Sequence, residues 1–436
     1  MTSDGDALGI CGGKTVRPLA NALHDIAGAL LVALAFSIPL SNALNSVLVV
    51  AIVLVVLLGQ WAGSWRGRWA PVLRHPVILA CLALYGSVLM AAAWSSAPPV
   101  TVGGQMLRSL SLLMLPLFAV VLWGTRWIQR CLLAFSLAMG LTLALSMVHG
   151  LWGLADAGAW LLPYKGDGDA IFHVHITHNV LMSVAVLVWI SQALDRKDLP
   201  TGTRCALVGL AVLGAINILW MVPGRTGYAT LLASLLMLAA VRCPRQWLGP
   251  CLVGIVVVCG AALWLSDSAQ NRLDRTWREI QAFGGADSAQ RGDVNLADHR
   301  LAIWREALGV IGQRPLLGHG TGSYRSAFCA SAQPANMCLY GGGKHPHNQF
   351  LFVAIEGGLL GVATYAAWVT MLAVCLWRRR NAGPMGAMGP GLWAIWMAYA
   401  MVDTPLQLLT ERHFFMLFFA MLLFAPKTGH HPSGAV

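Results

Sequence analysis

The chain has 436 residues, of which 57% are hydrophobic and only 11% are charged, and its formal net charge is +11. Soluble globular domains contain about 25% charged residues, so the composition excludes an ordinary soluble enzyme and indicates a membrane protein. Excess basic charge is common in nucleic-acid-binding proteins. No nucleic-acid-binding motif accompanies it here, and we expect no nucleic-acid partner.

Apolar stretches long enough to cross a bilayer core of roughly 30 Å recur along the whole chain. They predict an all-α polytopic membrane protein, a single transmembrane domain over residues 1–436 with about twelve spans. The first apolar run has no small-residue cleavage site after it, so we expect a retained span rather than a signal peptide. The predicted spans are 22–40, 44–61, 76–94, 107–124, 127–150, 177–194, 204–222, 226–242, 247–265, 348–376, 389–405 and 412–426.

Basic residues predict the orientation of these spans. With both termini cytoplasmic, every short inner loop holds at least two lysines or arginines, as in the runs 66–74 and 378–380, whereas the short outer loops hold almost none. This is the positive-inside pattern of a multi-pass protein. Long loops escape the rule, so the arginines of the segment 266–346 need another explanation.

Residues 266–346 form one large outer loop between spans 9 and 10. Helical patterning is present over 268–283 and 296–313, and in the second stretch an apolar stripe recurs at helical spacing. The stripe consists of Leu301, Trp304, Leu308 and Ile311. We expect a pair of helices that form a roof over the membrane bundle rather than a separate module.

Two cysteines, Cys329 and Cys338, lie in this outer loop, and most of the other cysteines are scattered through the predicted spans. An oxidising compartment permits a disulfide between them. Two free thiols are the alternative, and the spacing does not decide between the two states.

Four titratable or charged residues are predicted to gather at the outer interface: Arg225, Arg300, His347 and Asp403. Ionisable groups at membrane depth are functional candidates because they are costly unless paired or hydrated. Arginine binds phosphate oxygens bidentately, and histidine accepts a proton near neutral pH. A base beside two arginines suits transfer of a diphosphate-linked group to a hydroxyl, with the arginines stabilising the departing diphosphate.

Each of these residues also has a purely structural interpretation. Arg225 alone fits an interfacial anchor, Arg300 fits a solvated helix face, and His347 fits a helix-terminal residue bonded to backbone. Asp403 fits a helix end or a partner of Arg412. The set as a whole argues for function more strongly than any member.

Three other motifs are weaker. The segment FHVHITHN offers His173, His175 and His178 for zinc, but no acidic residue or cysteine lies nearby in the sequence, and a hydrated loop is the preferred interpretation. The segment KGDGDA at 165–170 has the aspartate spacing of metal-dependent glycosyltransferases, and it also fits a simple turn. The glycine-rich GHGTGS at 318–323 follows no strand, which argues against a nucleotide-binding loop. We therefore predict no metal site.

On these residues the chain resembles the O-antigen ligase family of Gram-negative inner-membrane proteins, within the O-antigen ligase/polymerase superfamily. The family signature is His, then Asn, Ser or Gln, nine residues, Gly, two residues, then Gly, Thr or Tyr. Here it is His347-Asn348, then Gly358 and Gly361. The family's arginine in an RTGY-like turn falls on Arg225, and its arginine before a loop tryptophan falls on Arg300.

The resemblance implies a transferase at the periplasmic face of the bacterial inner membrane, moving O-antigen from undecaprenyl diphosphate to a sugar hydroxyl of lipid A–core oligosaccharide. It implies independence of metal, nucleotide and other cofactors, with His347 as general base and Arg225 and Arg300 binding the diphosphate. A direct displacement would invert the anomeric centre. His345, Asn348 and Asp403 are candidate supporting residues.

Two further functions stay open at this stage. An O-antigen polymerase or a protein O-oligosaccharyltransferase of the same superfamily would use the same donor with another acceptor. A lipid or glycan transporter would place its polar groups near the bilayer midplane, whereas here the mid-span charge is nearly limited to Glu356.

Overall fold

The computed structural model describes residues 13–65, 67–124, 126–152, 169–267, 300–332, 338, 343–383 and 385–425, with a few positions between 269 and 281. All regular elements in these residues are helices, which confirms the all-α polytopic prediction. The predicted helix over 268–283 lies largely outside this range. The division into one transmembrane domain with a 266–346 loop stays a prediction.

The first half of the chain forms helices that begin at recognisable signals. Ser41 caps the second helix by accepting a hydrogen bond from the Leu44 amide, and prolines occupy the first positions of α4 and α5. The elements are α1 (Gly13–Ser37), α2 (Asn42–Trp61), α3 (Trp69–Leu73), α4 (Pro76–Ala91), η1 (Ala92–Trp94), α5 (Pro99–Ser109), η2 (Leu110–Leu113), α6 (Met114–Leu122) and α7 (Trp127–Trp152).

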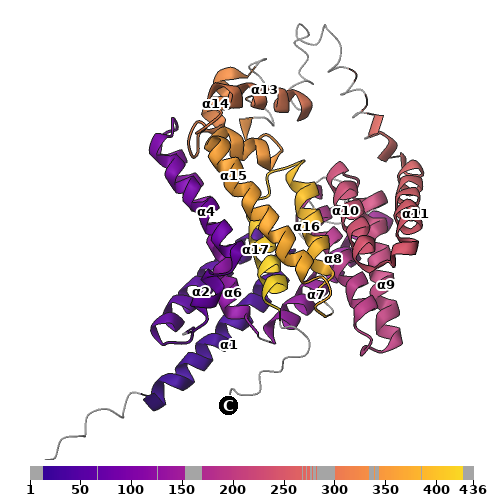
Figure 1. Ribbon diagram of the computed structural model, residues 1–436. Coiled ribbons are helices and arrows are strands. Elements are labelled where there is room, and N and C mark those ends of the chain that lie inside the picture. The colour runs from indigo at the N-terminus through magenta and orange to yellow at the C-terminus, as the bar shows by residue number, and fades with distance from the viewer. Residues whose placement is uncertain are drawn as a thin grey trace, which may run out of the picture.

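The second half supplies the centre of the bundle and the helices above it. These elements are α8 (His175–Asp195), α9 (Thr201–Ile216), η4 (Asn217–Met221), α10 (Arg225–Arg242), α11 (Arg245–Trp264), α13 (Arg300–Gln313), α14 (Tyr324–Ser331), α15 (Gln349–Arg378), α16 (Met388–Ala400) and α17 (Leu409–Phe424). Figure 1 shows α13 and α14 lying together over the end of the bundle at which α15 begins. We call this pair the roof and this end the roof end.

Helices occupy all twelve predicted spans, but nine described helices are long and apolar enough to cross a membrane. The remaining three predicted spans are occupied by helices that are shorter or less apolar. These helices are α10, α16 and α17, with 18, 13 and 16 residues. α10 has an arginine at each end, and α16 would extend only about 20 Å at 1.5 Å per residue.

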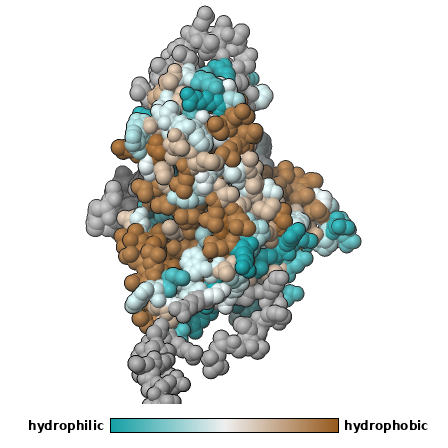
Figure 2. Space-filling view, turned by 60° about the vertical axis from the view of Figure 1, so that its left-hand side comes forward, coloured by the Kyte–Doolittle hydropathy of each residue, from teal (hydrophilic) through white to brown (hydrophobic). Residues whose placement is uncertain are grey.

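The core lies where α15, α16 and α17 meet, and almost every side chain of α17 is buried. Trp396 packs edge-on against Trp368 and Phe415, with ring centroids 5.4 and 4.8 Å apart. On the outside, apolar residues cover the middle of the molecule, and hydrophilic residues gather towards its ends (Figure 2). This distribution suits a bilayer-spanning bundle.

The apolar stripe predicted for the second loop helix is wrong by about one position. α13 buries Ala302, Ile303, Ala307 and Val310, whereas Leu308 is 59% exposed. The buried face of α13 includes two alanines, which allow the helix to pack closely against α14 and α15. The closeness of this packing determines which face of α13 is buried.

Candidate active site

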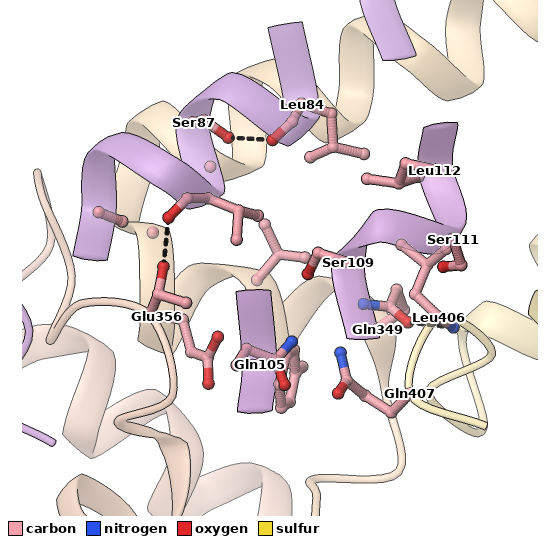
Figure 3. A pocket seen from close by; sticks show the side chains of 17 residues that line it. Leu84, Ser87, Gln105, Ser109, Ser111, Leu112, Gln349, Glu356, Leu406 and Gln407 are labelled. Atoms are coloured by element: carbon pink, nitrogen blue, oxygen red, sulfur yellow. Dashed lines mark hydrogen bonds between the residues drawn. The ribbon is translucent and has the colours of Figure 1, made fainter. Parts of the chain in front are cut away.

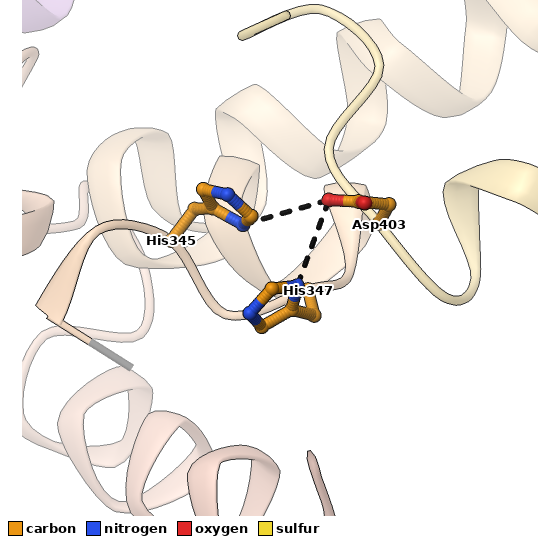
Figure 4. Close-up of side chains that lie close together, drawn as sticks. All are labelled: His345, His347 and Asp403. Carbon is orange, nitrogen blue, oxygen red and sulfur yellow. Dashed lines mark ion pairs between the residues drawn. The ribbon is translucent and has the colours of Figure 1, made fainter. Parts of the chain in front are cut away.

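The two histidines of the KHPH segment meet Asp403, which is distant in the sequence. His345 and His347 lie just before α15, and Asp403 lies between α16 and α17. The Nδ1 atoms of His345 and His347 are 3.5 and 3.7 Å from the same Oδ1 of Asp403 (Figure 4). The two imidazole centroids are 4.4 Å apart. The structure thus brings together three of the predicted site residues.

The first two residues after His347 hold this arrangement in place. The Asn348 side chain caps α15 by accepting from the amides of Phe350 and Leu351 at 2.9 and 3.1 Å. Its amide nitrogen also donates to the Met401 carbonyl at 3.1 Å. The Gln349 side chain accepts from the Leu406 amide at 3.1 Å. The start of α15 is therefore hydrogen-bonded to the chain on either side of Asp403, at Met401 and at Leu406.

His347 has a backbone φ of 50°, in the left-handed region that non-glycine residues rarely adopt. Such conformations cost of order 1–3 kcal/mol and cluster at functional sites. Here the conformation turns the chain from the KHPH loop into the Asn348 cap. The tertiary structure therefore holds the imidazole beside Asp403 although His347 by itself would favour a negative φ.

Burial and charge give the site a defined protonation pattern. Burial alone would raise the pKa of the Asp403 carboxyl, but the polar contact with His347 and the charge of His345 leave that pKa below its usual value. Burial lowers the pKa of His345 to about 4; Asp403 opposes the shift, while His347, Lys344 and Arg300 add to it. At neutral pH the site therefore contains an ionised Asp403 and a neutral His345.

Arg300, at the start of α13, is close enough to this cluster for its charge to act on both His345 and Tyr399. The indole nitrogen of Trp304 donates to the carbonyl of Pro346 at 3.0 Å. Pro346 stands between the two histidines, so the roof helix that carries Arg300 is tied directly to the histidine loop.

Arg225 begins α10 and is exposed. The turn before it packs on the first turns of α8, where the Asn179 amide donates to the Val222 carbonyl at 2.8 Å. The same end of α8 meets α17 through a 2.6 Å hydrogen bond from Thr177 to Glu411. These contacts place the turn that precedes Arg225 beside the start of α8, which in turn contacts α17; they do not place Arg225 beside the histidines.

Glu411 was missed by sequence analysis, although a glutamate at the edge of a long apolar run is a visible signal. Its Oε1 also accepts from the Tyr399 hydroxyl at 3.1 Å, and Tyr399 lies four positions before Asp403 in the chain. This buried carboxylate links α8, α16 and α17 beneath the site.

A pocket of about 50 Å³ begins at Gln349, two residues after His347. It lies between α4, α5, η2, α15 and the segment after Asp403. In Figure 3 the amides of Gln105, Gln349 and Gln407 and the carboxylate of Glu356 turn towards one space, with Leu84 and Leu112 on the apolar side. Such a mixed wall can accept hydroxyl groups and hydrocarbon together.

The glycine-rich GHGTGS segment is a structural clasp. Gly318, Gly320 and Gly322 have φ of 68°, 96° and 78°. The amides of His319 and Gly320 donate to the carbonyls of Ile355 and Glu356 at 2.8 and 2.9 Å. These carbonyls are free because α15 is broken at Gly358, where φ is 58° and ψ is −151°. These two backbone amides of the clasp are therefore hydrogen-bonded to α15. They are not available to bind a phosphate, which argues against a nucleotide-binding loop.

The histidines of FHVHITHN do not form a hydrated loop, so that interpretation is wrong. His173 and His178 are buried; their Nε2 atoms are 3.0 Å from the Ile38 carbonyl and 2.9 Å from Asn217 Oδ1. These separate partners also argue against a shared zinc. Residues 165–168 of KGDGDA lie outside the described range, and Asp169 contacts His149 at 2.9 Å.

The structure joins Cys329 and Cys338 in a disulfide, with their Cα atoms 5.1 Å apart. Cys329 lies in α14 and Cys338 lies on the way to the histidine loop. The crosslink therefore connects the roof to the segment that carries His345 and His347.

Comparison with known proteins matches residues 199–366 to a family model described as O-antigen ligase. The matched segment runs from the start of α9 into α15, so it contains Arg225, Arg300, His347 and the break at Gly358, while Asp403 follows it. No curated protein matches the chain.

Proposed function

We propose that the chain, whose residues 199–366 match the O-antigen ligase family model, is an O-antigen ligase of the bacterial inner membrane. It transfers O-antigen from undecaprenyl diphosphate to lipid A–core oligosaccharide at the periplasmic face. The observation that carries the proposal is the grouping of His345, His347 and Asp403 at the roof end of an apolar bundle, under the roof helix that Arg300 begins.

In this proposal His347 is the general base. Its Nδ1 faces Asp403, so Nε2 is the nitrogen that takes the proton from the acceptor hydroxyl. The hydroxyl oxygen then bonds to the anomeric carbon as the bond to the diphosphate oxygen breaks, with inversion. Asp403 positions His347 and stabilises the imidazolium that forms, as a carboxylate does in other acid–base dyads.

Arg300 and Arg225 are proposed to hold the diphosphate and to stabilise its negative charge as it departs. The helix starts support this assignment, because Arg225 opens α10 and Arg300 opens α13, and the amide end of a helix favours negative charge. The glutamine-lined pocket that begins at Gln349 offers side-chain amides that can bind sugar hydroxyls, next to apolar side chains.

Reconstitution tests the proposal. The purified protein in lipid nanodiscs would be given undecaprenyl-diphosphate-linked O-antigen and lipid A–core, without ATP or divalent metal, and products would be separated by gel electrophoresis. A ligase extends lipid A–core. Longer undecaprenyl-linked glycan without acceptor modification would identify a polymerase instead, and movement of unaltered donor across the bilayer would identify a transporter.

Alanine at Arg225 or Arg300 is expected to raise the KM for donor at least about tenfold, a loss of ~1.4 kcal/mol. The amount of folded protein in the membrane should not change. Normal donor kinetics for both variants would remove the diphosphate assignment while leaving the family membership intact.

A further inference from the structure

The His345–His347–Asp403 cluster has the donor atoms of a transition-metal site. Their ligand atoms all lie within 4.8 Å of one another, the only such group of three or more His, Cys, Asp or Glu side chains in the described part of the chain. Two imidazole nitrogens and one carboxylate oxygen form a donor set that binds zinc in proteins. The sequence predicts no metal site, because the metal interpretations considered there were those of FHVHITHN and KGDGDA, and His345 and His347 were considered only for catalysis.

The distances suit zinc. A tetrahedral ion with bonds of about 2.1 Å holds its ligand atoms roughly 3.4 Å apart. The two Nδ1 atoms are 3.5 and 3.7 Å from Asp403 Oδ1, and the three ligand atoms of the group all lie within 4.8 Å of one another, so small side-chain rotations would place all three around one ion. A third observation points the same way: both Nδ1 atoms are buried, and their contacts with Asp403 are too long or too poorly aligned for normal hydrogen bonds.

We propose that this cluster binds one Zn²⁺ ion and that zinc inhibits the transferase; the inhibitory part rests on the proposed function. An ion on Nδ1 of His347 fixes a proton on Nε2, because a neutral imidazole has one basic nitrogen. The base that takes the acceptor proton is then lost. The fourth coordination position stays open to water or to a diphosphate oxygen.

The surrounding charges limit how tightly the ion binds. Arg300 and Lys344 act on the cluster, and only Asp403 supplies a compensating negative charge among the ligands. The site is therefore reversible, and zinc binds more weakly than at closed structural sites with four ligands. In the alternative interpretation, Asp403 only orients the two histidines, and the cluster has no measurable affinity for zinc.

Metal binding is measured first, without substrates. Protein carrying a tag without histidines is stripped with a chelator, reconstituted in nanodiscs and titrated with Zn²⁺ against a chromophoric chelator, and with Co²⁺ by visible absorption. One equivalent of zinc and the intense bands of four-coordinate Co²⁺ are expected. His345→Ala and Asp403→Asn should each raise the Kd at least about tenfold, whereas His175→Ala, at the same end of the bundle, should not.

The inhibition is measured separately in the transfer assay. Zinc should abolish transfer at concentrations that match the measured Kd, and chelator should restore it. Binding that survives both His345→Ala and Asp403→Asn overturns the site, and full transfer with zinc bound overturns the inhibition. A protein that binds zinc through these residues but never transfers glycan contradicts the proposed function instead. Size-exclusion profiles show whether each variant is folded. If one of them misfolds, the zinc affinity of the other is enough to test the site.

Discussion

Substituting Gly358 by alanine tests how the roof is held over the site. Gly358 occupies a region of backbone space that only glycine adopts readily, with φ 58° and ψ −151°. A Cβ there would lie 2.5 Å from the Gly318 amide nitrogen and 2.5 Å from the Leu316 carbonyl oxygen. Both are backbone atoms, so the conflict is relieved only if the clasp moves away from α15.

The cost follows from the contacts that join the two segments. Backbone strain contributes about 1–3 kcal/mol. Three hydrogen bonds cross the break, from His319, Gly320 and Leu359 to the opposite segment at 2.8–2.9 Å, and each is worth about 0.5–1.5 kcal/mol. Their loss brings the total to about 3–7 kcal/mol, enough to release the clasp while the membrane helices stay folded.

Thermal unfolding in nanodiscs and proteolysis of the roof provide the assay. Gly358→Ala should melt earlier and expose the roof to protease. Gly357→Ala is the matched control, because its Cβ would meet no atom within 4 Å, and alanine favours a helix by up to about 1 kcal/mol over glycine. If the two variants melt and digest alike, the clasp does not secure the roof.

Three further predictions concern the same region. Arg300→Lys should recover part of the donor affinity that Arg300→Ala loses, because lysine keeps the charge without the bidentate fork; equal KM values for the two variants would contradict a diphosphate role. Trp304→Phe removes the hydrogen bond to the histidine loop and should destabilise the roof by about 1 kcal/mol, measured as a lower melting temperature with the core unchanged; an unaltered melting curve would count against this tether. Reduction of the Cys329–Cys338 disulfide should lower the roof's stability by about 2–3 kcal/mol, detected by protease sensitivity before and after reductant; Cys329→Ser should be insensitive to reductant, and a reductant effect that persists in it would point to another target.

Sequence periodicity predicted a helix at every apolar stretch because hydrophobic length is a local property. Which helices span a membrane was harder to predict. α17 has only 16 residues and is buried almost throughout, so its apolar character reflects packing against α15 and α16 as much as contact with lipid. A buried core helix and a lipid-facing span have similar local composition.

The candidate site was partly predictable for the same reason. His347 and Asn348 stood out because polar residues precede a long apolar run, and the resemblance to a family located Arg225 and Arg300. The partnership of both histidines with Asp403 depends on how α15 meets α16, which no local pattern contains. The role of Gly358 also became clear only when the loop that occupies the break was seen.

His347→Asn tests the central claim most directly. Asparagine tolerates a positive φ, so the turn into α15 is kept while the base is removed. Transfer from undecaprenyl-diphosphate-linked glycan to lipid A–core should fall at least about 100-fold, with donor affinity and melting temperature close to those of the unaltered protein. Transfer by His347→Asn at the unaltered rate would contradict the account.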